Sequence, residues 1–211
     1  MAYRCMATSA AGFVQQLAVA YVTHGYWFYV TGHIPEHKDP ALTDRKLIER
    51  YGIDVSKWIR ARRKRDGLAN VQYLRYGRFF VLLATHGEHP FFAEEEVQIR
   101  DIRRTPLNFM GYSIACRRGR TGRKHHASVR IHRERFRELK AQFERVAVQR
   151  SVEELCGELR AIPCEPYAPV CDQLRILLRA VNRRRKVAGL ELVHWTALRL
   201  RRVPLKPFAP G

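Results

Sequence analysis

The feature that most constrains the fold is a pair of apolar runs on either side of a short turn. Residues 71–75 and 78–84 are rich in β-branched, aromatic and leucine side chains, and Tyr76-Gly77 separates them. Runs of this kind around a glycine-containing turn predict the two strands of a β-hairpin. Because hairpin strands pair antiparallel, the chain should contain an antiparallel sheet rather than the parallel sheet of alternating β-α-β proteins.

Several helices are predicted around this hairpin. Asp39-Pro40 combines an N-cap residue with proline at the first helical position, and residues 151–154 have the spacing of a capping box. Apolar side chains recur every three or four residues over 136–146, which indicates an amphipathic helix. We therefore expect an α+β fold, with a mainly antiparallel sheet, helices on one face and a C-terminal helical extension. A ferredoxin-like sheet is one form that this order of elements can take.

The element order also predicts two regions. Residues 1–150 should form the α+β domain, and residues 151–211 should form the helical extension packed on it. No stretch approaches the roughly 20 uninterrupted apolar residues that a membrane helix needs, so we expect no membrane partner. The five cysteines are odd in number and contain no C-x-x-C pair, which argues against a disulfide framework or a zinc ribbon. These observations favour a reducing, cytoplasmic location.

Charge is the strongest indication of function. The chain has 39 Lys and Arg residues against 20 Asp and Glu residues, and its formal net charge is +19. Self-repulsion at this level destabilises a compact fold, and a bound polyanion relieves it. Of the 39 cations 31 are arginine, whose guanidinium can bind phosphate with two donors at once and stack on bases. A genome whose base composition favours arginine codons is the alternative explanation.

The cations form separate clusters, and nucleic-acid binding is expected to use them because phosphate contacts supply most non-specific affinity. A glycine-containing loop at 117–124 is the strongest single element, since a flexible basic hairpin tip can enter a groove or become ordered on RNA. Solvation of a charged face is the alternative for each cluster. The predicted nucleic-acid-binding residues are Arg60, Arg62, Arg63, Lys64, Arg65, Arg75, Arg78, Arg117, Arg118, Arg120, Arg123, Lys124, Arg183, Arg184, Arg185 and Lys186.

Aromatic residues lie beside two of these arginines in the predicted hairpin. Arg75 and Arg78 flank Tyr76, and Phe79 and Phe80 follow directly. Aromatic rings on a strand can stack unpaired bases while arginine binds the backbone. Side-chain alternation also directs Phe79 or Phe80 into the core, so both interpretations remain open.

Histidines suggest a second class of function. His86-Gly87-Glu88-His89 follows a predicted strand, where a divalent metal for phosphodiester cleavage could be held. However, the chain has no His-x-His pair, no Walker loop and no dinucleotide-binding fingerprint. The sequence assigns no catalytic residue, metal or cofactor, and it favours a binder over an enzyme.

These observations lead to three functional hypotheses. The first is a nucleic-acid-binding protein, with RNA slightly favoured over DNA, that grips the phosphate backbone through its arginine-rich clusters. The second is a metal-dependent nuclease or transposase-like enzyme that uses the His86–His89 region. The third is a basic structural subunit of a ribonucleoprotein, with other protein subunits as partners.

Overall fold

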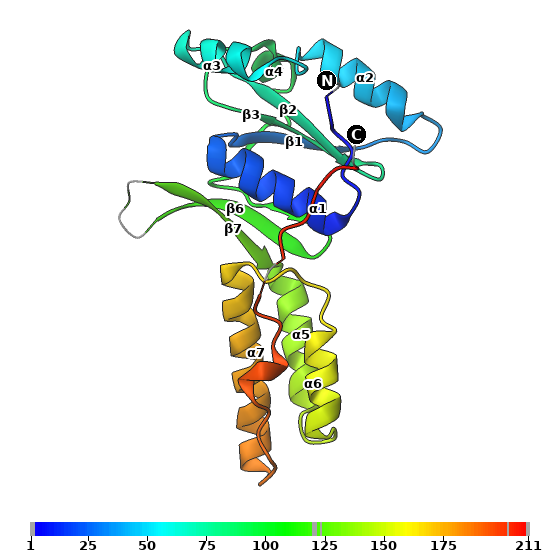
Figure 1. The fold of residues 1–211 in the computed structure, drawn as a ribbon, viewed down its shortest axis with the longest axis vertical. Coiled ribbons are helices and arrows are strands. Elements are labelled where there is room, and N and C mark those ends of the chain that lie inside the picture. Colours follow the sequence, from blue (N-terminus) through cyan, green and yellow to red (C-terminus); the bar gives the residue numbers. More distant parts are fainter. Residues whose placement is uncertain (1–2, 120–121, 123, 202, 210–211) are drawn as a thin grey trace. The chain divides into compact units, whose positions relative to one another are not determined.

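The computed structural model of the chain describes residues 3–119, 122, 124–201 and 203–209, and it divides into two compact units (Figure 1). The sheet unit comprises residues 1–107, 115–127 and 205–211, and the helical unit comprises residues 108–114 and 128–204. The units therefore divide the chain differently from the predicted boundary at residue 150. The helix over 133–146, which was predicted to belong to the α+β region, lies in the helical unit.

The sheet unit follows the expected order of helices and strands. Asp39 and Ser56 cap two of its helices, since their side chains accept hydrogen bonds from the backbone N–H groups of Ala41 and Ile59. Its elements are α1 (Ala10–Gln15), the π-helical η1 (Gln16–Tyr21), the short η2 (Val22–His24), β1 (Phe28–His33), α2 (Pro40–Arg50), α3 (Lys57–Arg65), β2 (Val71–Tyr76), β3 (Phe79–Ala84), α4 (Pro90–Glu94) and β4 (Arg100–Asp101).

The four strands form one antiparallel sheet in the order β2-β3-β1-β4. The predicted hairpin is confirmed, with Tyr76 opposite Phe79 at the turn and Val71 opposite Ala84 at the far end. Read along the chain, β1, β2, β3 and β4 are connected as β-α-β-β-α-β, and β1 lies between β3 and β4. This is the connectivity of a ferredoxin-like sheet, and it agrees with the predicted α+β class.

Helices cover both faces of this sheet, whereas the sequence predicted one. Val30, Tyr73 and Leu82 point to one face, where they pack with residues of α2 and α4 in a core cluster. On the opposite face the ring of Phe13 in α1 lies 5.8 Å from the ring of Phe79. The near-continuous burial of β2 and β3 is the physical reason, because a strand covered on both sides has no solvent face.

A second sheet contains β5 (Leu107–Phe109), β6 (Tyr112–Arg118) and β7 (His125–Ile131) in that order. Met110 and Gly111 join β5 to β6, and both have positive φ values, of 43° and 81°. Two such residues make the tight turn that suits the twist of hairpin strands. The boundary between the units falls within β6 and β7, so the end of this hairpin near residues 117–125 belongs to the sheet unit.

The helical unit is built from three helices around an apolar core. Ser151 and Glu154 form the predicted capping box, with the Ser151 hydroxyl and the Glu154 carboxylate each accepting a hydrogen bond from the other's backbone N–H. Leu139, Leu155 and Leu174 lie in the core that the three helices enclose. The elements are α5 (Arg133–Val146), α6 (Val152–Arg160), α7 (Ala168–Val187) and a single turn η3 (Trp195–Ala197). Among the described residues, no helix is both long enough and apolar enough to cross a membrane.

Candidate nucleic-acid interface

Arg75 is buried, and its guanidinium is fully committed within the sheet unit. Its side chain is 8% exposed, and its Nε and Nη2 each donate to the Asp44 carboxylate at 2.7 Å. Its Nη1 donates to the Gly77 carbonyl at 2.6 Å, and the Tyr73 hydroxyl also donates to Asp44. A buried carboxylate needs this compensation, because an unpaired charge in the interior is very costly. Arg75 is therefore a core residue, which corrects its predicted role as a phosphate ligand.

Arg78 also forms hydrogen bonds within the sheet unit. Its guanidinium donates to the carbonyls of Pro35, Glu36 and Lys38 at 2.6, 3.0 and 3.2 Å. These bonds close the loop that follows β1, which explains why an arginine stands at this turn. The neighbouring rings are also explained by packing, since Phe80 lies 5.7 Å from the Tyr73 ring and Phe79 faces α1.

The predicted cluster at 183–186 is divided among different surroundings. Arg185 is only 4% exposed and donates to the carbonyls of Ala147 and Arg150 at 2.7 and 2.8 Å, as well as to that of Glu191. It is therefore a structural residue, which corrects its predicted role in binding. Arg183 and Lys186 line a groove beside α7, while Arg184 lines a separate pocket with residues of α5. These four residues therefore do not line one common pocket.

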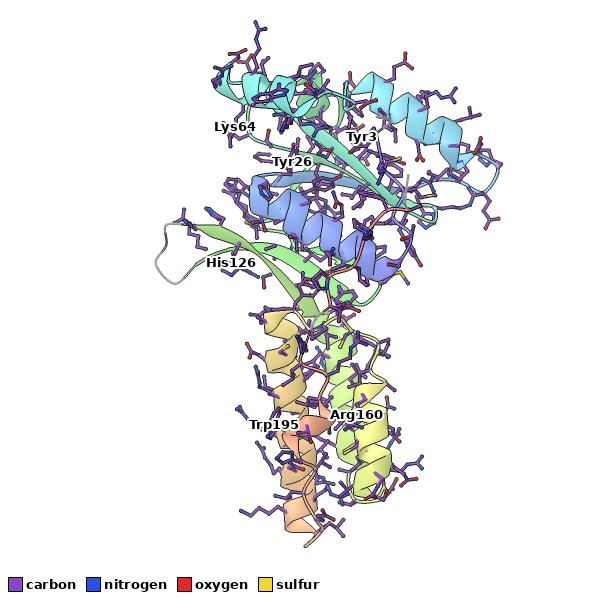
Figure 2. The ribbon with its side chains drawn as sticks, viewed as in Figure 1. Tyr3, Tyr26, Lys64, His126, Arg160 and Trp195 are labelled. Carbon is purple, nitrogen blue, oxygen red and sulfur yellow. The ribbon has the colours of Figure 1, made fainter. Side chains whose placement is uncertain are left out.

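The cluster on α3 is largely exposed. Arg62, Lys64 and Arg65 face solvent, and Figure 2 labels Lys64 on this helix. Arg63 is half-buried and donates to the Gly52 carbonyl at 3.2 Å. Arg60 is half-buried, and its Nε has no hydrogen-bond partner among the described residues. Arg62 also pairs with Asp66 at 3.6 Å, and part of the charge compensates the C-terminal end of the helix dipole. Lys64 and Arg65 are the exposed members of this cluster for which no ion pair is found among the described residues.

Three cations of the predicted loop at 117–124 are exposed in the structure. Arg117, Arg118 and Lys124 are exposed, and the Gly119 N–H donates to the Lys124 carbonyl at 2.8 Å, which closes the base of the loop. Figure 2 labels His126 on the adjoining strand. The predicted residues Arg120 and Arg123 lie outside the described residues.

The base of this loop adjoins a polar pocket of about 370 Å³ in the sheet unit. We call it the arginine pocket. It brings together two segments that are separate in the sequence, the turn after β4 and the end of the β6–β7 hairpin. Its lining consists of Asp101, Arg103, Arg104, Cys116, Arg117, Arg118 and His125.

Hydrogen bonds and ring contacts hold one side of the arginine pocket in place. The Asp101 carboxylate accepts from the Arg103 backbone N–H at 2.9 Å and from its Nη2 at 2.7 Å. The Arg103 guanidinium lies 4.5 Å from the centre of the Trp27 ring. The centre of the His125 ring lies 4.8 Å from the centre of the same Trp27 ring. Stacking on an indole favours a cation, so Arg103 is fixed before any ligand arrives.

The electrostatics of the arginine pocket favour an anion. Partial burial raises the pKa of Asp101, but the hydrogen bonds and charge of Arg103 outweigh that effect and hold the pKa below its ordinary value. Asp101 therefore stays ionised and neutralises one arginine. Three further arginines remain, and burial raises the pKa of the Cys116 thiol, which keeps it uncharged. Clefts lined by one sign of charge concentrate ligands of the opposite sign.

Arg103 and Arg104 were missed by the sequence analysis. The apolar residues of 93–104 fit the strand period and the helix period equally well. In the structure β4 is only two residues long and is defined by its pairing with Phe28 and Tyr29 of β1. The available signal was Asp101-Ile102-Arg103-Arg104, in which an aspartate and two arginines surround one apolar residue.

The His86–His89 segment has a structural explanation. His89 caps α4, since its Nδ1 accepts a hydrogen bond from the Phe91 N–H at 3.1 Å. Gly87 has φ of 134°, and a Cβ there would lie 2.6 Å from the backbone nitrogen of Ala69. Glu88 exchanges backbone hydrogen bonds with Gly67 and Ala69. In the part of the chain that the structure describes, no group of three or more His, Cys, Asp or Glu side chains is placed to hold a metal ion.

A scan against models of protein families gives no match, and searches of curated proteins and of solved structures also give none.

Proposed function

We propose that this protein binds the phosphate backbone of a nucleic acid through the arginine pocket and the loop beside it. The observation that carries the proposal is the convergence of Arg103, Arg104, Arg117 and Arg118 around one polar pocket whose single carboxylate is already paired. Guanidinium groups bind phosphate with directional donors. The exposed cations of α3 belong to the same unit and add to its positive field.

We favour RNA slightly over DNA as the ligand. Arginine-rich loops that become ordered on binding are a frequent means of RNA recognition. All five cysteines are free thiols, which supports a reducing location such as the cytoplasm. A role as a basic subunit of a ribonucleoprotein is compatible with the same surface.

The test compares two variants that lose the same charge. The first carries Arg104→Ala, Arg117→Ala and Arg118→Ala in the arginine pocket. The control carries Arg133→Ala, Arg137→Ala and Arg145→Ala, which are exposed positions of α5 in the helical unit. Fluorescence anisotropy with labelled single- and double-stranded RNA and DNA would measure the affinity of each.

We expect the pocket variant to bind about 100-fold more weakly near 0.15 M salt. Each lost phosphate contact reduces the magnitude of the slope of log affinity against log salt concentration by about 0.9, and the variant loses three contacts. The control should bind within about threefold of the unsubstituted protein, since the α5 arginines make no contact in this proposal. Equal losses in both variants would show that net charge alone governs binding. Failure of the unsubstituted protein to bind at low salt would refute the proposal.

A second arm separates binding from cleavage. Labelled substrates incubated with the protein and Mg²⁺, Mn²⁺ or Zn²⁺ should remain uncut. Metal-dependent cleavage that His86→Ala or Glu88→Ala abolishes while binding persists would instead favour the nuclease hypothesis.

A further inference from the structure

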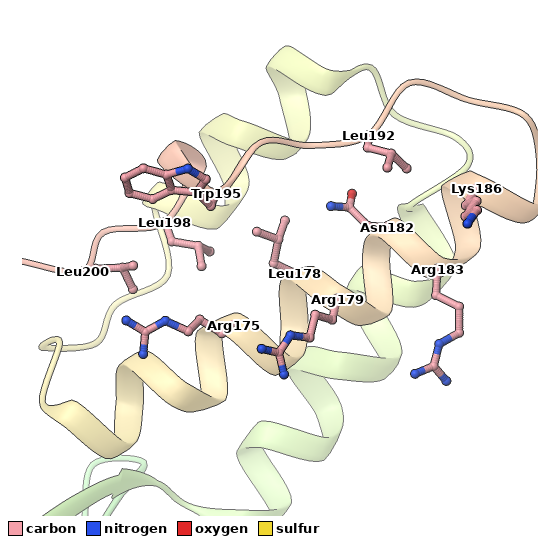
Figure 3. A pocket seen from close by; sticks show the side chains of 10 residues that line it. All are labelled: Arg175, Leu178, Arg179, Asn182, Arg183, Lys186, Leu192, Trp195, Leu198 and Leu200. Carbon is pink, nitrogen blue, oxygen red and sulfur yellow. The ribbon is translucent and has the colours of Figure 1, made fainter.

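The helical unit contains a groove of about 660 Å³ between α7 and the segment that follows it (Figure 3). We call it the α7 groove. Figure 3 shows Leu178 of the helix and Leu198 of this segment extending into the space between them, with arginines spread along the helix. The lining residues are Arg175, Leu178, Arg179, Asn182, Arg183, Lys186, Leu192, Trp195, Leu198 and Leu200.

The α7 groove has an apolar floor and an exposed apolar wall. Leu178 and Leu198 form its buried base, each 7% exposed. Leu192 and Trp195 stand on its far wall and are 49% and 63% exposed. Apolar side chains gathered in a concave surface are typical of a site that another molecule covers.

Hydrogen bonds hold the wall that carries Leu192 and Trp195. The Asn182 side chain donates to the Val193 carbonyl at 2.8 Å and accepts from the Val193 N–H at 2.9 Å. Arg185 donates to the Glu191 carbonyl, and the His194 side chain caps the η3 turn that bears Trp195. The groove is therefore built before a ligand binds, which lowers the entropic cost of association.

A row of cations runs along the helical side of the groove. Arg175, Arg179, Arg183 and Lys186 follow one another at intervals of four, four and three residues, which places them on one face of α7. Arg175 pairs with Asp172 at 2.8 Å. For the other three, no ion pair is found among the residues that the structure describes. The row therefore offers positive charge to a ligand.

We propose that the α7 groove binds an acidic, leucine-rich segment of a partner protein. Aliphatic side chains of the segment would cover Leu178, Leu192 and Trp195, while its carboxylates pair with Arg179, Arg183 and Lys186. Amphipathic segments bind apolar grooves in this way, with anchors on one face and charges at the rim. The occupant is acidic because every charged residue that lines the groove is a cation.

A nucleic acid fits this groove less well. Its phosphates could meet the cations, but Trp195 is the single aromatic ring of the lining on which a base could stack, and the four leucines offer bases no hydrogen bond. The inference is independent of the proposed function, because every residue involved belongs to the helical unit. Either of the two can fail without the other.

The experiment is a selection of displayed random short peptides on the full-length protein. We expect the enriched sequences to combine Asp or Glu with Leu, Ile or Phe at regular spacing. Their affinity should fall by about tenfold or more in Arg179→Glu/Arg183→Glu, because reversing rim charges removes attraction and adds repulsion. It should also fall in Leu192→Asp, a half-exposed position at which the substitution need not disturb the core.

The matched control is Arg184→Glu, which changes an exposed arginine of the same helix that lines a different pocket. This variant should bind the selected peptides with unchanged affinity. Selected peptides without acidic enrichment, or peptides bound equally well by Arg179→Glu/Arg183→Glu, would overturn the proposal. Binding of a single-stranded oligonucleotide that this double variant abolishes would assign the groove to nucleic acid instead.

Discussion

The arginine pocket and the α7 groove each present four cations, yet their surroundings differ. In the arginine pocket the cations surround a carboxylate, a thiol and an imidazole, whereas in the α7 groove they border leucines and an indole. A polar pocket binds most tightly a ligand whose charged groups keep their hydrogen bonds. A groove with an apolar floor binds most tightly a ligand that also buries hydrocarbon surface. The difference teaches that clusters of arginine in one sequence can lie in chemically different surroundings.

Two buried arginines sharpen this contrast, because each is engaged entirely by its own unit. Arg75 is paired with a carboxylate, and Arg185 is surrounded by three backbone carbonyls. Neither is available to a ligand, although both lie among the residues that sequence alone assigns to binding. Substitutions at these positions would reduce binding by unfolding the unit that presents each surface.

The largest expected effect is therefore on stability. Arg75→Met should lower the free energy of unfolding by about 3–5 kcal/mol, because it leaves the buried Asp44 carboxylate without its partner. Arg185→Met should cost about 3 kcal/mol, since buried carbonyls lose their donor. Chemical denaturation would measure both, with the exposed Arg65→Met as control and an expected change within about 0.5 kcal/mol. A cost at Arg75 no greater than that at Arg65 would contradict its assignment to the core.

The next effect tests whether the two surfaces are separate. The pocket variant with Arg104, Arg117 and Arg118 changed to alanine should lose nucleic-acid affinity about 100-fold but retain the peptides selected on the α7 groove. Arg179→Glu/Arg183→Glu should do the reverse and change nucleic-acid affinity by less than about threefold. Anisotropy measured with both ligands on both variants gives a complete cross-comparison. Parallel losses would mean that the two surfaces act as one.

Much of the fold could be predicted because its signals are local. Tyr76-Gly77 identified the hairpin, Asp39-Pro40 identified the start of α2, and the spacing of Ser151 and Glu154 identified the start of α6. Each depends on residues within a few positions of one another, where backbone geometry and side-chain capping determine the outcome.

The site could be predicted only in part, because it depends on contacts between distant residues. Arg117 and Arg118 were identified from their charge, but Arg103 reaches the pocket through a strand of two residues that pairs with β1. Arg75 was assigned to the surface because its partner, Asp44, lies 31 residues away. Burial of a charged residue is invisible to composition and spacing unless its counter-ion is close in sequence.

The smallest expected effect is a pH dependence of the stability of the sheet unit, which the helical unit should not share. Burial, followed by the charge of Arg63, lowers the pKa of His89 from its ordinary value of 6.5. Below that pH the unfolded chain binds a proton more readily than the folded protein does, so stability is complete above about pH 6.5 and falls as the pH decreases. His89→Asn keeps an N-cap acceptor and should remove this dependence.

Urea unfolding of both proteins over this pH range would measure the effect, which should be confined to the sheet unit. An equally steep loss of stability in His89→Asn would assign the dependence to other groups.

The central claim, that the arginine pocket grips phosphates, is tested most directly by the salt dependence of nucleic-acid binding. For the unsubstituted protein, the logarithm of affinity should fall against the logarithm of salt concentration with a slope of magnitude about 5 or more, as expected for about six phosphate contacts. In the variant that lacks Arg104, Arg117 and Arg118 the magnitude should be smaller by about 3. A flat titration, or an identical slope in the two proteins, would contradict the account.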